Sequence, residues 1–132
     1  MTTSDKPDLV VGLVKTRDST ERPADERVGI LPHVAEVIAI VANVGGAIAE
    51  PTTTRFWLRS ADTVRELRIV ETPELPPGDE VEVTALWDLR ADSGEYTIIV
   101  TADAFAQIDE LRRDNNTATV HVAVRSGHVE VR

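Results

Sequence analysis

The amino-acid sequence predicts an all-β fold of two packed antiparallel sheets, and three observations support this. Apolar residues alternate with other residues through residues 94–103 and 115–124, which is the period of two expected of half-buried strands. Hydrophobic residues make up 42% of the chain and aromatic residues only 4%, so the core must be aliphatic. No stretch keeps a helical period for more than a turn or two. The polar residues 104–114 between the two runs therefore predict an antiparallel hairpin with a long connection.

The length of 132 residues predicts one domain, residues 1–132, that buries about two thirds of the surface of its unfolded chain. We expect loose termini at residues 1–6 and 126–132. The chain has no cysteine, which excludes a disulfide framework, a thiolate zinc site and a cysteine nucleophile.

The formal charge of −9, from 23 acidic against 14 basic residues, argues against nucleic acid as a partner because like charges repel. No apolar run approaches the roughly 18 residues that a membrane-spanning helix needs, so no membrane insertion is expected. The first residues also lack the apolar segment of a secretory signal.

The first half of the chain begins with a predicted strand at residues 8–14. A charged surface loop is expected at residues 15–27, and a short strand-like piece at residues 28–31. Residues 34–44 form the longest predicted strand, and both of its faces are largely apolar. The turn that follows holds Asn43 and two glycines, which are common turn residues.

The second half continues with a strand at residues 54–60, whose Phe56 and Leu58 face the core. Residues 64–71 resemble a charged edge strand, and residues 73–78 a rigid turn before a long strand at 81–87. About seven strands at regular spacing predict an immunoglobulin-like sandwich of two antiparallel sheets. Four side chains are expected in its core, namely Val41, Trp87, Tyr96 and Val120.

Several short motifs follow one another along the chain: PDLVV at residues 7–11, VANVG at 41–45, LPPG at 75–78, Trp87, GEY at 94–96, DE at 109–110 and DNNT at 114–117. In this order they resemble the motifs of the CARDB family, the bacterial cell-adhesion-related domain. The resemblance extends from residue 7 to about residue 124. It implies a seven-stranded immunoglobulin-like fold and a non-catalytic role as a module of exported or cell-surface proteins. Because no signal peptide is present in this chain, a cytoplasmic or particle-associated location stays open.

The acidic crossing at residues 103–116 offers the oxygen ligands that calcium prefers, with Asp103, Asp109, Glu110 and Asp114 as the candidate ligands. Their spacing matches no EF-hand pattern, and Arg112 and Arg113 lie among them. We therefore expect a loop whose side chains bond its own backbone and which needs no metal. The three histidines are scattered and are expected at the surface.

Apolar and aromatic side chains on the outer faces of strands are the candidate interface residues. If Val37, Ala39 and Val41 face the core, then Ile38 and Ile40 point outward, and Leu86 joins them from a neighbouring strand. On another strand Trp57 points outward between Arg55 and Arg59. Exposed aliphatic and aromatic residues on regular strands are typical of protein–protein interfaces.

No catalytic motif is present, so no cofactor is expected and the sequence predicts a non-catalytic binding or adhesion module. Its expected partners are proteins, a second copy of the chain among them. Two other functions remain open: a structural subunit of an intracellular or particle-associated assembly, and a carbohydrate-binding accessory domain.

Overall fold

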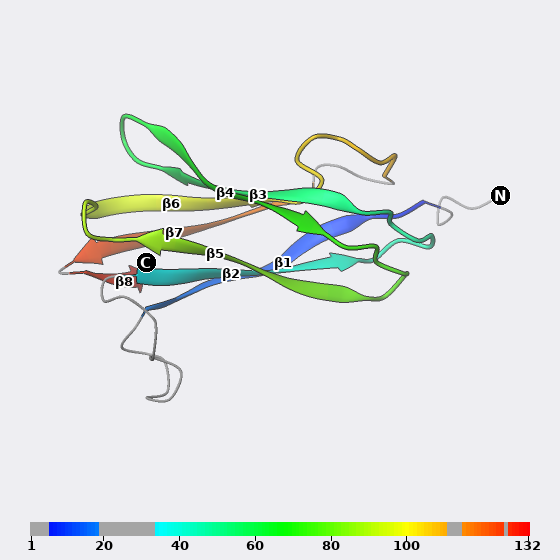
Figure 1. Ribbon diagram of the computed structural model, residues 1–132, viewed down its shortest axis with the longest axis horizontal. Coiled ribbons are helices and arrows are strands. Elements are labelled where there is room, and N and C mark those ends of the chain that lie inside the picture. Colours follow the sequence, from blue (N-terminus) through cyan, green and yellow to red (C-terminus); the bar gives the residue numbers. More distant parts are fainter. Residues whose placement is uncertain (1–5, 19–33, 111–114, 126) are drawn as a thin grey trace.

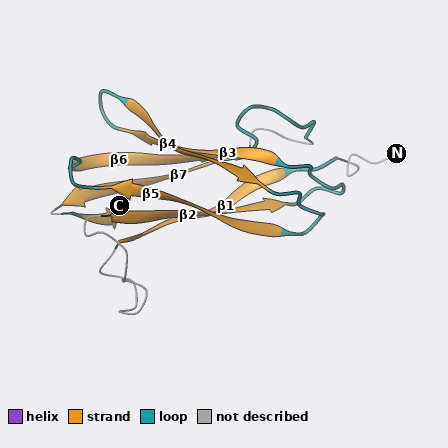
Figure 2. Ribbon diagram, in the orientation of Figure 1, coloured by secondary structure: helices purple, strands orange, loops and turns teal. Residues whose placement is uncertain are grey.

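The computed structural model describes residues 6–18, 34–110, 115–125 and 127–132. These residues form eight strands and no helix (Figure 2). In chain order the strands are β1 (Leu9–Asp18), β2 (Val34–Asn43), β3 (Thr52–Arg59), β4 (Val64–Thr72), β5 (Glu80–Asp88), β6 (Gly94–Thr101), β7 (Thr117–Arg125) and β8 (His128–Val131).

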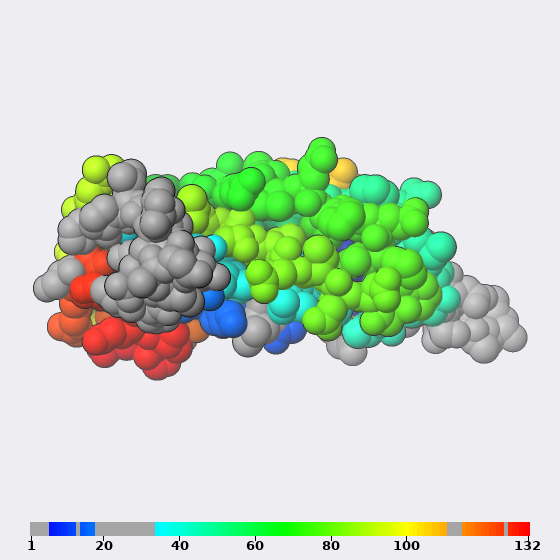
Figure 3. All heavy atoms as spheres, turned by 60° about the horizontal axis from the view of Figure 1, so that its bottom comes forward, coloured from blue at the N-terminus to red at the C-terminus, as the bar shows by residue number. Residues whose placement is uncertain are grey.

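The strands form two antiparallel sheets that pack face to face along the length of the molecule (Figure 1). The first sheet has the order β1-β2-β5, and the second has the order β4-β3-β6-β7-β8. The outermost strands β4 and β5 lie side by side along one flank (Figure 3), where the Arg68 side chain of β4 donates to the Thr84 carbonyl of β5 at 2.9 Å. The predicted all-β sandwich is confirmed.

The core lies between the two sheets and is mainly aliphatic, with Phe56 and Trp87 as its largest buried side chains. Trp87 is 1% exposed and meets Tyr96 edge-on, with 5.2 Å between the ring centroids. Val41 is fully buried as expected, whereas Tyr96 and Val120 are only half-buried at the margin of the core.

The turn after β2 is built around Asn43, which is completely buried. Its Oδ1 accepts hydrogen bonds from the backbone of Asp8 and Gly45, at 3.1 and 3.0 Å. Its Nδ2 donates to the carbonyls of Ala47 and Leu75, both at 2.8 Å. A Cβ at position 45 would lie 2.3 Å from the Lys6 carbonyl, so only glycine fits there. These contacts explain the asparagine and glycine of the VANVG motif.

The structure corrects two expectations about the strands. Residues 128–131 are not a loose terminus but an eighth strand, because Gly127, at a φ of 77°, allows the chain to reverse and Val129 packs on the core. Residues 15–18 extend β1 instead of beginning a loop, since they pair with β2 and Arg17 forms an ion pair with Glu36 at 3.5 Å. The expected loop over residues 19–27 and the short piece at 28–31 lie outside the described residues.

Candidate binding face

The outer face of the five-stranded sheet carries three rows of side chains that the strand register places side by side. Running across β4, β3, β6 and β7, the first row is Val64, Arg59, Thr97 and His121; the second is Glu66, Trp57, Ile99 and Thr119; the third is Ile69, Arg55, Thr101 and Thr117. We call this surface the Trp57 face. Within these three rows the only carboxylate is that of Glu66, although acidic residues outnumber basic ones in the chain, and Glu71 and Glu95 occupy the next outward positions on β4 and β6. The face is therefore mainly hydroxyl-bearing, apolar and cationic.

Trp57 occupies the middle row and is half-buried among its neighbours. The guanidinium of Arg55 lies over its indole ring, 4.2 Å from the ring centroid. Arg55 in turn pairs with Glu66 across the strands, with 2.8 Å between Nε and Oε1. The Trp57 indole N–H is shielded from solvent and has no hydrogen-bond partner. Because a buried indole N–H usually finds an acceptor, this unpaired donor is unusual.

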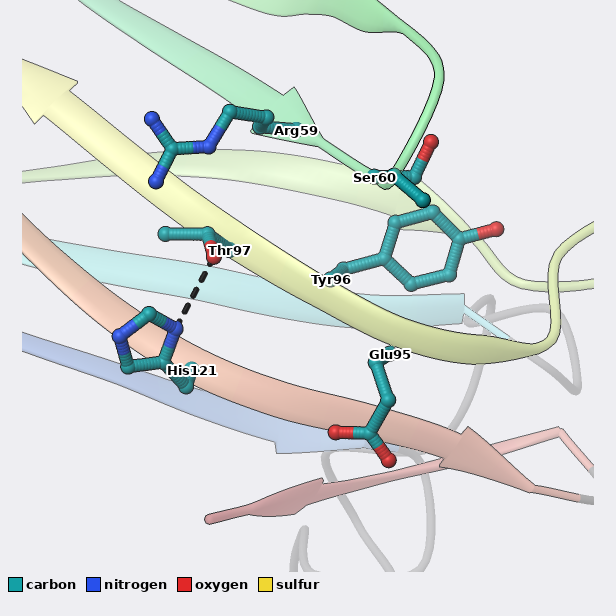
Figure 4. A pocket seen from close by; sticks show the side chains of 7 residues that line it. Arg59, Ser60, Glu95, Tyr96, Thr97 and His121 are labelled. Atoms are coloured by element: carbon teal, nitrogen blue, oxygen red, sulfur yellow. Dashed lines mark hydrogen bonds between the residues drawn. The ribbon is translucent and has the colours of Figure 1, made fainter.

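A shallow depression of about 570 Å³ lies at one end of the Trp57 face. It is lined by the first row and by the turn after β3, with Arg59, Ser60, Ala61, Glu95, Tyr96, Thr97 and His121 as its lining residues (Figure 4). The turn is held closed by a bond of 2.9 Å between the hydroxyls of Ser60 and Thr63 and by the Ser60 backbone N–H, which donates to the Thr63 carbonyl at 2.9 Å. This hydrogen-bonded turn therefore forms one side of the depression.

Thr97 and His121 lie next to each other in the depression, with 2.9 Å between the threonine Oγ1 and the imidazole Nδ1. In Figure 4 the Arg59 and His121 side chains lie on opposite sides of Thr97. Glu95 also lines the depression, but its carboxylate forms an ion pair with Arg132 at 3.0 Å. Thr97 and His121 were not among the predicted interface residues, because the register that joins them to Arg59 is a long-range feature.

The candidate interface residues do not form one surface. Arg55, Trp57 and Arg59 lie on the five-stranded sheet, whereas Ile38, Ile40 and Leu86 lie on the outer face of the three-stranded sheet. The expectation that Ile38 is exposed is wrong: it is 5% exposed, because it occupies the central strand between Lys15 and Thr84. Ile40 is half-buried, and Leu86 is 57% exposed.

The candidate calcium ligands have other roles within the described part of the loop. Asp103, at 3% exposure, accepts hydrogen bonds from the backbone of Gln107 and Ile108, at 2.7 and 3.4 Å. Asp109 is exposed and forms an ion pair with Lys6 at 3.1 Å. Among the described residues no group of three or more His, Cys, Asp or Glu side chains is placed to hold a metal ion. Asp114 lies outside the described residues.

Glu110, at 7% exposure, joins the loop to the first strand. Its Oε2 accepts the Leu9 backbone N–H at 2.8 Å and its Oε1 accepts a bond from Asn116 at 2.6 Å. Burial raises the pKa of Glu110 and the neighbouring Asp103 raises it further, against the opposing effect of the bonds from Leu9 and Asn116. Folding therefore favours the protonated form of Glu110, although the bonds from Leu9 and Asn116 themselves favour the charged carboxylate.

The CARDB profile matches residues 6–120 of the chain. The chain belongs to the CARDB family. A comparison with curated proteins finds no similar sequence.

Solved structures of CARDB domains resemble the chain over nearly its whole length. The CARDB domain of the PF1109 protein from Pyrococcus furiosus, crystallised in complex with di-metal ions, is 25% identical, with a TM-score of 0.69 and coverage of 95% of this chain and 94% of that one. A domain of a putative cell surface protein from Methanosarcina acetivorans is 18% identical, with a TM-score of 0.68 and coverage of 92% and 94%. The second likeness shows the fold alone.

The same fold also occurs as part of larger enzymes. The β-glucosidase 3B of Thermotoga neapolitana is 14% identical, with a TM-score of 0.57, and the match covers 96% of this chain but only 17% of that protein. The match therefore shows a shared sandwich fold within a small part of the enzyme. In the described part of this chain, no helix has the length and apolar character needed to cross a membrane.

Proposed function

We propose that this CARDB domain is a non-catalytic binding module that docks a protein partner on the Trp57 face. The observation that carries the proposal is the setting of Trp57, an outward tryptophan between two arginines whose one carboxylate neighbour, Glu66, is paired with Arg55. Tryptophan and arginine are enriched among residues that dominate binding energy, because they bury large areas at a small entropic cost. Lysine, glutamate and aspartate, by contrast, are depleted in interfaces.

The partner best suited to this face presents carboxylates around an apolar centre. The Arg59 side chain makes no ion pair or hydrogen bond with the other described residues, and its charge is available to a partner. Two copies of the chain meeting through this face would bring together two arginine-bearing surfaces on molecules of charge −9. Charge complementarity therefore favours a different, acidic partner over a second copy.

A role in adhesion would be one use of such a module, and a place in a particle-associated assembly would be another. Both would use the same face, so the proposal does not depend on the compartment. A carbohydrate is less well suited, because Arg55 already covers one face of the indole ring on which a sugar would stack.

The test is selection from a displayed library of random peptides against the whole chain. We expect the selected peptides to contain acidic residues and to bind the Trp57→Ala variant at least about tenfold more weakly, as expected when an interface anchor is removed. Leu86→Ala is the matched control, because Leu86 is exposed on the other sheet. It should leave the affinity unchanged.

The proposal fails if selection yields no peptide that depends on Trp57, or only peptides that depend on Leu86. Sedimentation of the parent chain provides a second check. If the parent self-associates and Trp57→Ala abolishes this, the occupant is a second copy and the acidic partner is wrong.

A further inference from the structure

We propose that the depression beside Thr97 is a carboxylate-binding site, where Arg59 and the Thr97–His121 pair hold an aspartate or glutamate side chain of the partner. This inference rests on the proposed function, since it names the polar anchor that a partner on the Trp57 face would use. It adds the position at which a carboxylate of the partner binds and two residues, Thr97 and His121, that the Trp57 argument does not use.

Arg59 supplies the charge of the proposed site. Most described arginines already pair with a carboxylate of the chain, as Arg17, Arg55, Arg65, Arg90 and Arg132 do. Arg59 is exposed at the end of β3 and forms no such pair among the described residues. An unpaired guanidinium in a chain with an excess of acidic residues remains able to bind a carboxylate from outside.

The hydrogen bond between Thr97 and His121 leaves one donor of the pair unused, whichever of the two side chains donates in it. If the threonine hydroxyl donates to Nδ1, the imidazole carries its proton on Nε2 and can donate from there. If Nδ1–H donates to Oγ1, the threonine hydroxyl proton is free to donate instead. One hydrogen-bond donor of the pair is therefore available to a ligand in either tautomer.

The register places these donors at a suitable separation. Arg59 pairs with Thr97 and Thr97 pairs with His121 across three adjacent strands. Strands lie about 4.8 Å apart, so the Arg59 and His121 backbones are about 10 Å apart with Thr97 between them. The two side chains bracket Thr97 (Figure 4). A carboxylate above Thr97 can accept from the guanidinium through one oxygen and from the pair through the other.

Two features of the depression favour a carboxylate over a phosphate. It offers one unpaired guanidinium, whereas phosphate sites usually combine several cations or backbone N–H groups. Glu95 also lines it, and although Arg132 pairs with that carboxylate, its charge would oppose a doubly charged ligand more than a singly charged one.

The experiment is an NMR titration of the whole 132-residue chain, labelled with ¹⁵N, with three probes. The probes are N-acetylglutamate methylamide, its neutral counterpart N-acetylglutamine methylamide, and inorganic phosphate. The protein variants are Arg59→Gln and Thr97→Val, with Arg125→Gln as the matched control. Arg125 is an exposed arginine on β7 of the same sheet, outside the residues that line the depression.

We expect the glutamate derivative to shift the amide signals of Thr97 and His121 in a saturable way and the glutamine derivative to leave them unmoved. Arg59→Gln should weaken the apparent affinity about tenfold, Thr97→Val by a smaller factor, and Arg125→Gln by less than about twofold. Equal shifts from both derivatives, full affinity in Arg59→Gln, or a response to phosphate alone would each overturn the proposal.

The two proposals can fail separately. Library peptides that require Trp57 but bind Arg59→Gln as tightly as the parent would overturn the carboxylate site and leave the docking face intact. Binding of the glutamate derivative at Thr97, together with peptides that ignore Trp57, would support the carboxylate site and overturn the proposed function.

Discussion

The guanidinium of Arg55 lies 4.2 Å from the centroid of the Trp57 ring and is held there by an ion pair of 2.8 Å with Glu66. The tryptophan of the proposed docking face is thus partly covered by a charged side chain of its own strand. A partner that stacks on the ring face covered by Arg55 must displace Arg55, whereas a partner with a carboxylate can bind to Arg55 in place. The arrangement keeps an outward tryptophan shielded in the free protein.

This relationship predicts that Arg55→Ala exposes Trp57. Acrylamide should quench the tryptophan fluorescence of the variant more strongly than that of the parent, and the signal reports Trp57 because Trp87 is buried. The free energy of unfolding should fall by no more than about 1 kcal/mol, as expected for an exposed cation–π contact. Arg59→Ala is the control, and quenching that rises equally in both variants would contradict the arrangement.

Trp87→Ala should reduce the free energy of unfolding by about 3–5 kcal/mol, since the change removes the largest side chain of the core and leaves a cavity. It also removes the bond of 2.7 Å from the indole N–H to Asp92. Urea unfolding measures the effect. The neighbouring Leu86→Ala, at an exposed position, should change stability by less than about 0.5 kcal/mol. Similar midpoints for the two variants would show that Trp87 does not anchor the sandwich.

Asp92 accepts bonds from both Trp87 and Arg65, at 2.7 and 2.6 Å. Partial burial raises the pKa of Asp92, but the bonds from Arg65, Trp87 and Tyr96 together with the charge of Arg65 outweigh it and hold the pKa below its usual value of 3.8. A lowered pKa contributes stability above the pKa of the unfolded chain, and this stability is lost as the pH falls through the folded value.

We therefore expect Asp92→Asn to be less stable than the parent at neutral pH, by about 1–3 kcal/mol, and to lose less stability on acidification below pH 3.8. The measurement is the free energy of unfolding as a function of pH. Asp88→Asn is the control, since Asp88 also pairs with an arginine but is exposed. Parallel pH profiles for the parent and Asp92→Asn would exclude the assigned role.

The stability that Glu110 contributes beside Asp103 should change with pH in the direction opposite to that of Asp92. The raised pKa of Glu110 contributes stability below the ordinary glutamate value of 4.5, and this stability is lost as the pH rises through the folded value. Asp103→Asn removes the adjacent negative charge, and asparagine tolerates the φ of 46° at this position. We expect the variant to lose less stability than the parent over this rise in pH. Asp109→Asn, which changes an exposed carboxylate, should follow the parent.

The sequence was sufficient to predict the fold because the strands alternate clearly and the turn residues are specific. The asparagine and glycine after β2 show why: one buried amide makes four hydrogen bonds, and one close backbone approach excludes any side chain. The charged residues 15–18 and the short strand at 128–131 were missed. Their pairing depends on neighbouring strands rather than on local pattern.

The candidate site could be predicted only in part for the same reason. Alternation along β3 placed Trp57 outward between Arg55 and Arg59, and the structure has them so. Alternation within one strand cannot show which residues of other strands lie next to it. The sequence therefore did not predict that Thr97 and His121 lie beside Arg59. It also cannot show how neighbouring strands shield a central strand, which is why Ile38 was expected to be exposed.

The last prediction is that the loop after β6 needs no metal for stability. Asp103 and Glu110 accept hydrogen bonds from the protein and Asp109 pairs with Lys6, so the described carboxylates of the loop have partners without a cation. Thermal unfolding should give the same midpoint with calcium and with a chelator. A rise of several degrees with calcium would contradict the prediction, because a ligand that binds only the folded state stabilises it. The buried Oδ1 atoms of Asn115 and Asn116, which have no hydrogen-bond partner, would then be the first additional ligands to test, by Asn116→Ala.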